Sequence, residues 1–229
     1  MFESKYGKFI TIILIVLVLL IIGVLAYLGF RVFKTFNLSN EGRETAERFE
    51  EQFINGQTSS NNTNNQTNAI NLDVTPDIAP EADITSGSGS SDNTKTQTYK
   101  GFVMVGTIEI PKTNLKCPVL ERASSDAIEV AVGIYAGPGL NKVWNTVIAG
   151  HNYRNGTFFS DNKKLSEGDK VYITDTTGKK VTYTIYKVYT TTPEDIEYVN
   201  KDTNGKREIS LTTCTDDTNS RIIIWASAD

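Results

Sequence analysis

The sequence predicts a mostly β domain in its C-terminal half, an antiparallel barrel or sandwich, preceded by a transmembrane helix and a disordered linker. Three observations lead to this prediction. Residues 9–30 contain no charged side chain, residues 55–98 are poor in bulky apolar side chains, and residues 99–229 hold one short β-rich segment after another. A long uncharged apolar stretch favours a helix in lipid, a polar stretch buries too little surface to fold, and repeated short strands favour a barrel or sandwich.

Composition excludes several classes of protein. The 229 residues include 23 basic and 27 acidic side chains, and this net charge of −4 argues against a nucleic-acid-binding protein. The two cysteines, Cys117 and Cys214, are too few for a disulfide-rich domain or a cysteine-rich metal site. His151 is the one histidine, so a single copy of the chain cannot form a site that needs several imidazole ligands.

Residues 1–8 are expected to form a short N-terminal tail, and residues 9–30 a transmembrane helix. At about 1.5 Å per residue, a helix over 9–30 is about 33 Å long, enough to cross the apolar part of a bilayer. A cleaved signal peptide is the rival hypothesis, but its apolar core is usually shorter, and no small-x-small cleavage site follows this one. Basic residues flank both ends of the stretch, so charge does not determine its orientation.

Residues 31–54 are expected to form a juxtamembrane helix, because Ala46, Phe49 and Phe53 recur at helical spacing after a candidate cap at Ser39 or Asn40. We favour a polar extension of the membrane helix over a packing or dimerising stalk.

Residues 55–98 are expected to be a flexible low-complexity linker, rich in Asn, Thr, Ser and Gly.

Residues 99–229 are the predicted folded domain. Val, Ile, Thr and Tyr dominate, and the apolar side chains alternate along the candidate strands. The predicted strands are 102–110, 115–120, 143–150, 170–174, 179–190, 207–214 and 221–227. Helical patterns are limited to 124–132 and a turn within 158–165, so a parallel α/β sheet is not expected.

Three residues suited to acyl transfer lie at strand ends. Cys214 ends one predicted strand, His151 directly follows another, and Arg221 opens the last. A thiol nucleophile, an imidazole acid/base and a cation that stabilises an oxyanion together suffice for this chemistry. Taken singly, each residue has a structural explanation: a buried cysteine, a surface histidine and a solvated arginine. A disulfide between Cys117 and Cys214 is a further alternative, although Cys117 shares a strand face with apolar neighbours and is expected in the core.

The combination resembles the sortase family. The run Ser210-Leu211-Thr212-Thr213-Cys214 is similar to the TLxTC-type sortase motif, with Ser in place of the first Thr. The upstream Gly150-His151 and the downstream Arg221 follow the family's order, and the anchor and linker before the domain match as well.

This resemblance implies a closed eight-stranded sortase-type β-barrel with short helices, and a thiol peptidase/acyltransferase activity on the outer face of a Gram-positive cell membrane. Cys214 is then the nucleophile that cleaves an LPxTG-like sorting signal through a thioacyl-enzyme. His151 is the acid and then the base, Arg221 stabilises the oxyanion or positions substrate, and Thr213 supports the oxyanion. The implied partners are surface proteins that bear sorting signals, an amine of a cell-wall precursor or a pilin lysine, and membrane lipid around the single span.

No cofactor or metal is expected, although some sortases bind calcium and the resemblance leaves that question open. The predicted subclass is A-like or D-like, because the chain lacks the long insertion of class B and the lid motif of class C, whereas Gly150-His151-Asn152 is class-B-like. The alternative function is a non-catalytic extracellular β-domain that binds a partner on a membrane-tethered stalk. A papain-like hydrolase is disfavoured because it would place its cysteine before its histidine.

Overall fold

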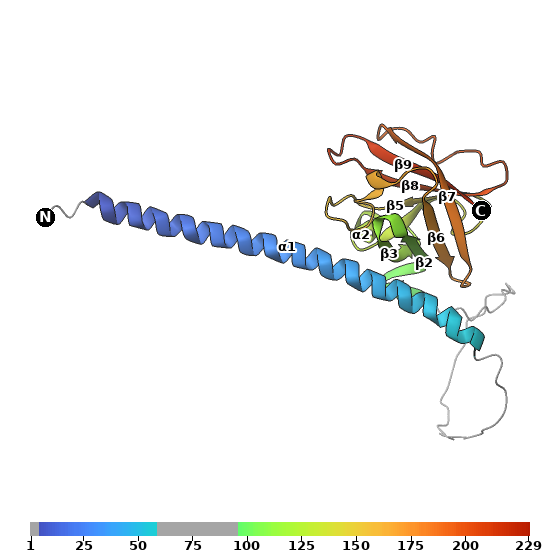
Figure 1. Cartoon of the computed structure of the whole chain (residues 1–229), viewed down its shortest axis with the longest axis horizontal. Coiled ribbons are helices and arrows are strands. Elements are labelled where there is room, and N and C mark those ends of the chain that lie inside the picture. Colours follow the sequence, from blue (N-terminus) through green and yellow to red (C-terminus); the bar gives the residue numbers. More distant parts are fainter. Residues whose placement is uncertain (1–4, 59–95) are drawn as a thin grey trace, which may run out of the picture.

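The structure is a computed structural model that describes residues 5–58 and 96–229 (Figure 1). The predicted linker falls mostly outside the described residues. The elements are α1 (Lys5–Thr58), β1 (Gln97–Tyr99), β2 (Phe102–Ile110), β3 (Leu115–Leu120), α2 (Ser125–Ile128), β4 (Val132–Ala136), β5 (Trp144–Ala149), β6 (Lys170–Asp175), β7 (Lys180–Thr191), β8 (Arg207–Cys214) and β9 (Arg221–Ala228), with 3-10 turns at Pro111–Thr113 and Asn162–Lys164.

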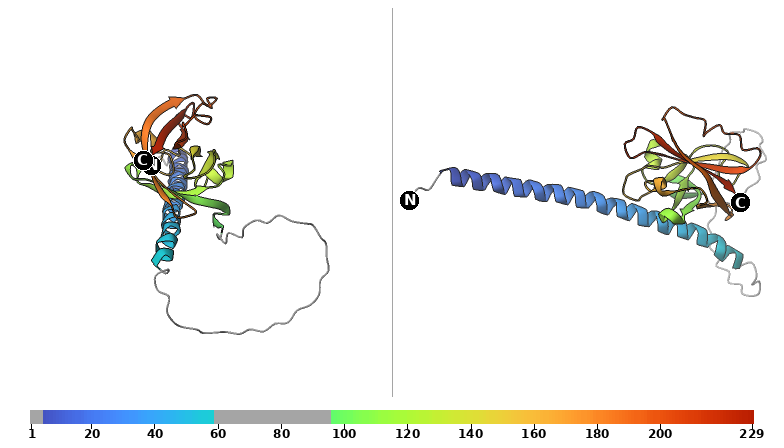
Figure 2. Two further views of the ribbon diagram at one scale, coloured as in Figure 1. Left: turned by 90° about the vertical axis from the view of Figure 1, so that its right-hand side faces the viewer. Right: turned by 45° about the horizontal axis from the view of Figure 1, so that its top comes forward.

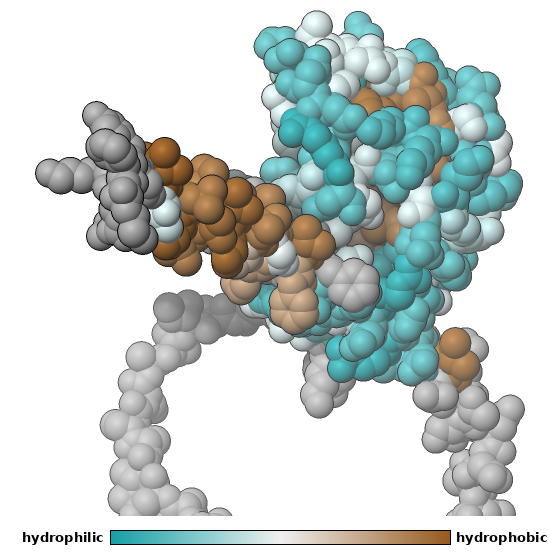
Figure 3. Space-filling view, turned by 60° about the vertical axis from the view of Figure 1, so that its left-hand side comes forward, coloured by the Kyte–Doolittle hydropathy of each residue, from teal (hydrophilic) through white to brown (hydrophobic). Residues whose placement is uncertain are grey.

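Helix α1 is continuous over 54 residues. Its segment Ile10–Phe30 has a mean hydropathy of 3.2 and no buried residue, so it is long and apolar enough to cross a membrane. Figure 3 shows this hydrophobic surface leading to a mainly hydrophilic barrel. The predicted helix start at Ser39 or Asn40 is wrong, because no Pro or Gly interrupts residues 31–40 and the helix continues through them.

The barrel consists of eight strands and is closed. The strands follow the order β2-β3-β4-β5-β8-β9-β7-β6, and β6 pairs back onto β2, for example at Ile108 and Ile173. The short β1 pairs antiparallel with β2 outside this ring. The predicted mostly β barrel is therefore confirmed, with β1 and β4 as strands that the sequence patterns did not reveal.

Two of the strand pairs differ from the antiparallel arrangement that the sequence predicts. Strands β3 and β4 pair in parallel, and so do β5 and β8. The expectation failed because apolar alternation is the same in both kinds of sheet and shows nothing about which distant strand becomes a neighbour.

The predicted helix over 124–132 is limited to α2. The hydroxyl of Ser124 accepts a hydrogen bond from the backbone N–H of Ala127 and caps this short helix. Val132 then opens β4, whose residues pair with β5. Pairing with a neighbouring strand thus replaces the continuation of a weak helix.

Apolar side chains fill the barrel interior, and a second cluster lies outside it. The interior includes Ile148, Leu211 and Ile224, all fully buried. The outer cluster contains Val147, Tyr198 and Ile223, with Trp225 packed against it. Each cluster takes alternate residues of β5 and β9, because successive side chains of a strand point to opposite faces.

Candidate active site

Cys214 and Arg221 face each other across two neighbouring strands. Cys214 is the last residue of β8 and pairs with Arg221, the first residue of β9. Directly opposed residues of an antiparallel pair have Cβ atoms about 4.5–5.5 Å apart. Both side chains are half-buried. Of the ion pairs between described residues, none includes Arg221, and its Nη1 donates a hydrogen bond to the backbone carbonyl of Ser220 at 3.3 Å.

His151 is brought to the same end of the barrel by the parallel pairing of β5 with β8. Ala149 pairs with Thr212, and the N–H of Gly150 donates to the carbonyl of Thr212 at 3.2 Å. His151 follows Ala149 by two residues, and Cys214 follows Thr212 by two residues. Since neighbouring strands are about 4.8 Å apart, this register places the imidazole and the thiol level with each other.

Gly150 turns His151 outward. A Cβ at position 150 would lie 2.8 Å from Cγ1 of Val132 and 2.9 Å from Cδ2 of Phe159, so this position faces the crowded barrel interior. The next side chain, that of His151, consequently lies on the outer side.

The outer face of the sheet is shared by the thiol, the imidazole and the guanidinium. On β8, Ile209 and Leu211 point into the core, so Cys214 points outward. On β9, Ile222 and Ile224 point into the core, so Arg221 points outward. The three predicted residues therefore meet on one face at one end of the barrel.

Thr213 differs from these three. Its side chain is 3% exposed and lies on the opposite strand face from Cys214, with the interior residues. Its hydroxyl has no hydrogen-bond partner within the described part of the chain. A side-chain contact between Thr213 and an oxyanion near Cys214 is therefore not supported.

Asn152 links the histidine segment to the cysteine strand. Its side-chain amide donates to the backbone carbonyl of Cys214 and to Oδ1 of Asp216, both at 2.9 Å. Its own Oδ1 accepts the backbone N–H of Arg154 at 3.0 Å, and Lys163 bonds the other oxygen of Asp216 at 2.5 Å. These contacts fix the residue after His151 against the residues around Cys214. No role was predicted for Asn152 from the sequence, although its position directly after His151 is a signal that points to one.

Tyr153 packs near the imidazole. Its ring centroid is 5.0 Å from that of His151, and it also lies 6.0 Å from Phe158. Burial, with a contribution from the negative charge of Glu129, raises the pKa of Tyr153. The phenol is therefore neutral near pH 7, and its ring packs against those of His151 and Phe158. Sequence analysis missed this residue.

The outer cluster (Val147, Tyr198 and Ile223) is an apolar surface on the same sheet face as the three residues. Hydrogen bonds hold the segment 192–206 against this face. Asn145 donates its side-chain amide to the carbonyl of Tyr198 at 2.7 Å, and the hydroxyl of Ser210 donates to Oδ1 of Asn145 at 2.9 Å. Ser210 is the residue that departs from the Thr of the sortase motif. Its hydroxyl makes a buried hydrogen bond to the Asn145 side chain, whose amide in turn bonds this segment.

The two cysteines differ in environment. Both are free, so the alternative of a disulfide between them is not realised. Cys117 is buried among the core residues, as its strand pattern predicts, and this burial raises the pKa of its thiol to about 12. Since the thiolate is the reactive species, Cys117 is unreactive at neutral pH.

Other candidate sites on the described part of the chain lack the groups needed for catalysis or metal binding. Residues 5–58 and 96–229 contain no group of three or more His, Cys, Asp or Glu that could hold a metal ion. A hollow of about 340 Å³ between Gly137–Lys142 and Asp175–Thr177 contains no cysteine or histidine. In the segment 192–206, Asp195 accepts hydrogen bonds from Thr191 and from the backbone of Glu197, which makes it part of a local turn.

Comparison with known proteins agrees with this geometry. The family model of the sortase domain matches residues 108–229, and the chain therefore belongs to the sortase family. It is 35% identical over 117 residues to sortase A of Bacillus anthracis, covering 48% of this chain and 52% of the relative. It is 29% identical over 133 residues to sortase A of Streptococcus agalactiae, covering 55% and 53%. The chain thus spans about half the length of the curated relatives it matches.

Solved structures of sortases have a similar fold. Sortase A from Corynebacterium diphtheriae is 25% identical with a TM-score of 0.51, over 56% of this chain and 61% of that one. A Clostridium perfringens sortase D5 transpeptidase is 26% identical with a TM-score of 0.50, over 55% and 79%. A pilus-related sortase C of Group B Streptococcus is 25% identical with a TM-score of 0.51, over 55% and 67%. Since A, C and D sortases are all similar, the subclass stays a prediction.

Proposed function

We propose that this chain is a membrane-anchored cysteine transpeptidase that cleaves an LPxTG-like sorting signal and transfers the protein that bears it to an amine. The observation that supports this most directly is the convergence of Cys214, His151 and Arg221 on one outward face. Cys214 and Arg221 are direct cross-strand partners, and the β5–β8 register brings His151 level with Cys214.

In the first half of the proposed reaction, the Cys214 thiolate attacks the carbonyl carbon of the Thr in the sorting signal. A tetrahedral intermediate forms, and the negative charge on its oxygen lies near the Arg221 guanidinium. The C–N bond then breaks, the leaving amine takes a proton from the His151 imidazolium, and a thioacyl-enzyme remains.

In the second half, an acceptor amine attacks the thioester carbonyl while His151 removes its proton. The C–S bond breaks, a new amide forms and the thiolate is regenerated, so every proton taken is returned. The acceptor is proposed to be an amine of a cell-wall precursor or a pilin lysine. The segment Ile10–Phe30 is proposed to cross the cell membrane once, with the barrel outside.

A turnover assay tests this proposal. The full-length protein in detergent is incubated with a library of LPxTG-type peptides and several amine acceptors. We expect cleavage and ligation from the wild type, none from Cys214→Ala, almost none from His151→Ala, and near-normal rates from Cys117→Ala. Full activity of Cys214→Ala would falsify the mechanism.

Thiol labelling separates this proposal from a non-catalytic binding domain. A small methanethiosulfonate should modify Cys214 well before Cys117, because Cys214 is half-exposed and Cys117 is 4% exposed with a raised pKa. Labelling of Cys214 no faster than that of Cys117 would support the non-catalytic binding domain instead.

A further inference from the structure

The C-terminal part of α1 packs against the barrel wall. Figure 1 and the right view of Figure 2 show the barrel beside the C-terminal half of α1. Ala46 is fully buried and Phe49 is 1% exposed, although both belong to a helix whose other faces are exposed. Gly42 lies against β3, where an added Cβ would be 3.6 Å from Pro118 and 3.9 Å from Cβ of Cys117.

Polar contacts surround this apolar strip, which we call the docking strip (Gly42, Ala46, Phe49 and Phe53). Glu41 pairs with Lys100 at 2.5 Å, and Arg43 donates to Oδ1 of Asn114 at 3.1 Å. The side chains of Gln52 and Gln97 are hydrogen-bonded at 2.6 Å. Contacts therefore extend along about three turns of the helix and reach β1, β3 and the turn that precedes β3.

Glu50 is at the centre of the polar contacts. Its carboxylate accepts the Thr107 hydroxyl at 2.7 Å and the Lys116 ammonium at 3.0 Å. It also accepts the Thr174 hydroxyl at 3.3 Å and lies 3.9 Å from the ammonium of Lys180. One helical side chain thus bonds to or pairs with β2, β3, β6 and β7. A half-buried carboxylate with several donors is typical of a specific contact rather than of a solvated helix face.

The membrane-distal end of the docking strip contacts the turn between β6 and β7. A Cβ at Gly178 would come within 2.6 Å of the Phe53 ring, so the glycine provides the space that this ring occupies. Strand β7 begins directly after this turn and ends at Thr191, which pairs with Arg221. The candidate catalytic end therefore lies at the other end of β7 from Phe53.

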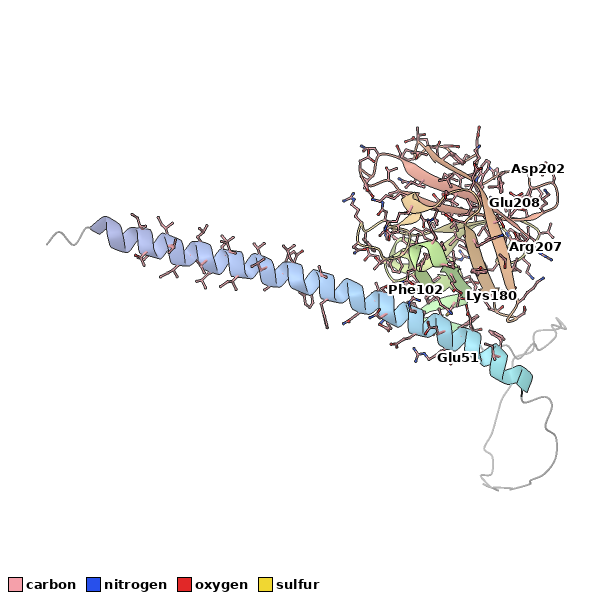
Figure 4. All side chains as sticks on the ribbon, viewed as in Figure 1. Glu51, Phe102, Lys180, Asp202, Arg207 and Glu208 are labelled. Atoms are coloured by element: carbon pink, nitrogen blue, oxygen red, sulfur yellow. The ribbon has the colours of Figure 1, made fainter. Side chains whose placement is uncertain are left out.

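The course of strand β8 shows which end of the barrel faces the apolar segment of α1. Arg207 and Glu208, at the start of β8, lie at the end of the barrel that is away from the N-terminal half of α1 (Figure 4). The C-terminus, at the end of β9, lies on the same side (Figure 1). β8 consequently runs toward the apolar span and ends at Cys214, beside Arg221.

We propose that α1 is a fixed support, on which the barrel is docked through Glu50 and the docking strip with its catalytic end turned toward the membrane. This proposal rests on the proposed membrane anchoring and transpeptidase function. From Phe30, at the end of the apolar segment, to Ala46 the helix rises about 24 Å, so the barrel is held at a defined height above the lipid. Substrates attached to the same membrane are then favoured over substrates in solution.

Cutting the chain between α1 and the barrel tests the docking. A protease site is inserted between residues 70 and 71 of the full-length protein, the protein is reconstituted in vesicles and cut, and the vesicles are sedimented. We expect the wild-type barrel to sediment with the vesicles. Glu50→Lys, which places a cation beside Lys116 and Lys180, should increase the released fraction by about tenfold. Release of the wild-type barrel to the same extent would overturn the proposal.

Two matched variants control for charge and for backbone strain. Glu51→Lys makes the same charge change on the exposed neighbouring position and should release no more barrel than the wild type does. Gly178→Ala should increase release, whereas Gly205→Ala should not. Both glycines have a positive φ, 78° and 76°, but only a Cβ at Gly178 meets Phe53. Equal effects within either pair would contradict the assigned contacts.

Fluorescence quenching tests the orientation without any enzymatic readout. In the Cys214→Ala background, Thr218→Cys labels the loop between β8 and β9, and Asn204→Cys labels the turn before β8 at the opposite end. With quenchers on lipid headgroups, the label at 218 should be quenched more strongly, and Glu50→Lys should abolish the difference. Equal quenching in the otherwise unchanged protein would overturn the orientation.

A rate comparison then tests the consequence for substrates. The ratio of rates on a lipid-anchored and a soluble LPxTG-type peptide should fall in Glu50→Lys, while its rate on the soluble peptide stays unchanged. An unchanged ratio would contradict the fixed-support role. If no peptide is cleaved at all, the proposed function fails, while sedimentation and quenching still decide whether the barrel is docked.

Discussion

The side-chain amide of Asn152 donates a hydrogen bond of 2.9 Å to the backbone carbonyl of Cys214. This bond joins the residue after His151 to the proposed nucleophile itself. It crosses between β8 and the segment that follows β5, the two segments whose relative position sets the distance between imidazole and thiol. A contact of this kind affects the geometry of the site rather than its chemical groups.

Asn152→Ala should therefore lower kcat by about five- to tenfold with little change in KM, since a single hydrogen bond contributes about 1 kcal/mol. Steady-state kinetics on an LPxTG-type peptide measure this. Asn155→Ala is the matched control, because Asn155 bonds only within its own loop, to Thr157, in the described structure. Equal kcat values for the two variants would show that the Asn152 contact does not position the site.

Arg221→Ala should reduce kcat/KM by about 10²–10³-fold, the range observed when one oxyanion donor is lost. Arg221→Lys keeps the charge without the planar fork of donors and should recover only part of the rate. Arg154→Ala, an exposed arginine in the loop after His151, serves as the control and should stay within about twofold of wild type. Full activity of Arg221→Ala would remove this residue from the mechanism.

Gly150→Ala should destabilise the barrel by about 1–3 kcal/mol, because the new methyl group overlaps buried side chains. Val132 and Phe159, which it would meet at 2.8 and 2.9 Å, are both 0% exposed and have no room to move. Thermal unfolding should show a lower Tm, and activity should fall because His151 is displaced. Gly42→Ala, whose Cβ would meet its neighbours at 3.6 Å or more, should leave Tm unchanged or raise it.

Acid should release the barrel from α1. Burial alone would raise the pKa of Glu50, but hydrogen bonds from Thr107 and Lys116 and the charges of Lys116 and Lys180 hold it below its ordinary value of 4.5. A lowered pKa in the docked state means that the carboxylate stabilises docking above pH 4.5 and loses this effect as the pH falls through the lower, docked value. The groups that face the carboxylate are Thr107, Lys116, Thr174 and Lys180, the last of which also pairs with Glu109.

Sedimentation of the cut protein between pH 7 and pH 3 measures this release. Glu50→Gln removes the titrating charge, so its release should depend less on pH and should already be higher at pH 7. The same acid response in wild type and Glu50→Gln would show that another group controls it.

Much of the fold was predictable because local patterns determine it. Alternating apolar residues marked β2, β3, β7, β8 and β9 closely, since one face of each strand must be buried. β1 and β4 were not predicted because they are short, and α2 was predicted too long because nothing local showed that Val132 pairs with Val119 of β3. The expected boundaries at 54 and 98 differ from the structure, where α1 continues to Thr58 and β1 begins at Gln97.

The candidate site was predictable in its residues but not in its geometry. Cys214, His151 and Arg221 stood out by chemistry and by their places at strand ends. Thr213 was predicted to support the oxyanion, yet the pleat of β8 turns its side chain inward. The contacts of Asn152 and Tyr153 were not predicted, because they depend on residues that are distant in the chain or on the fold of their own loop.

By itself the sequence determined an apolar span, a β-rich domain and three reactive side chains, because composition and alternation are properties of a chain read locally. Only the tertiary structure decided that β5 and β8 are parallel neighbours, that Asn152 bonds the backbone carbonyl of Cys214, and that Glu50 joins the helix to four strands. The physical reason is that strand register and helix docking arise from contacts between residues far apart in the chain, which no local pattern encodes.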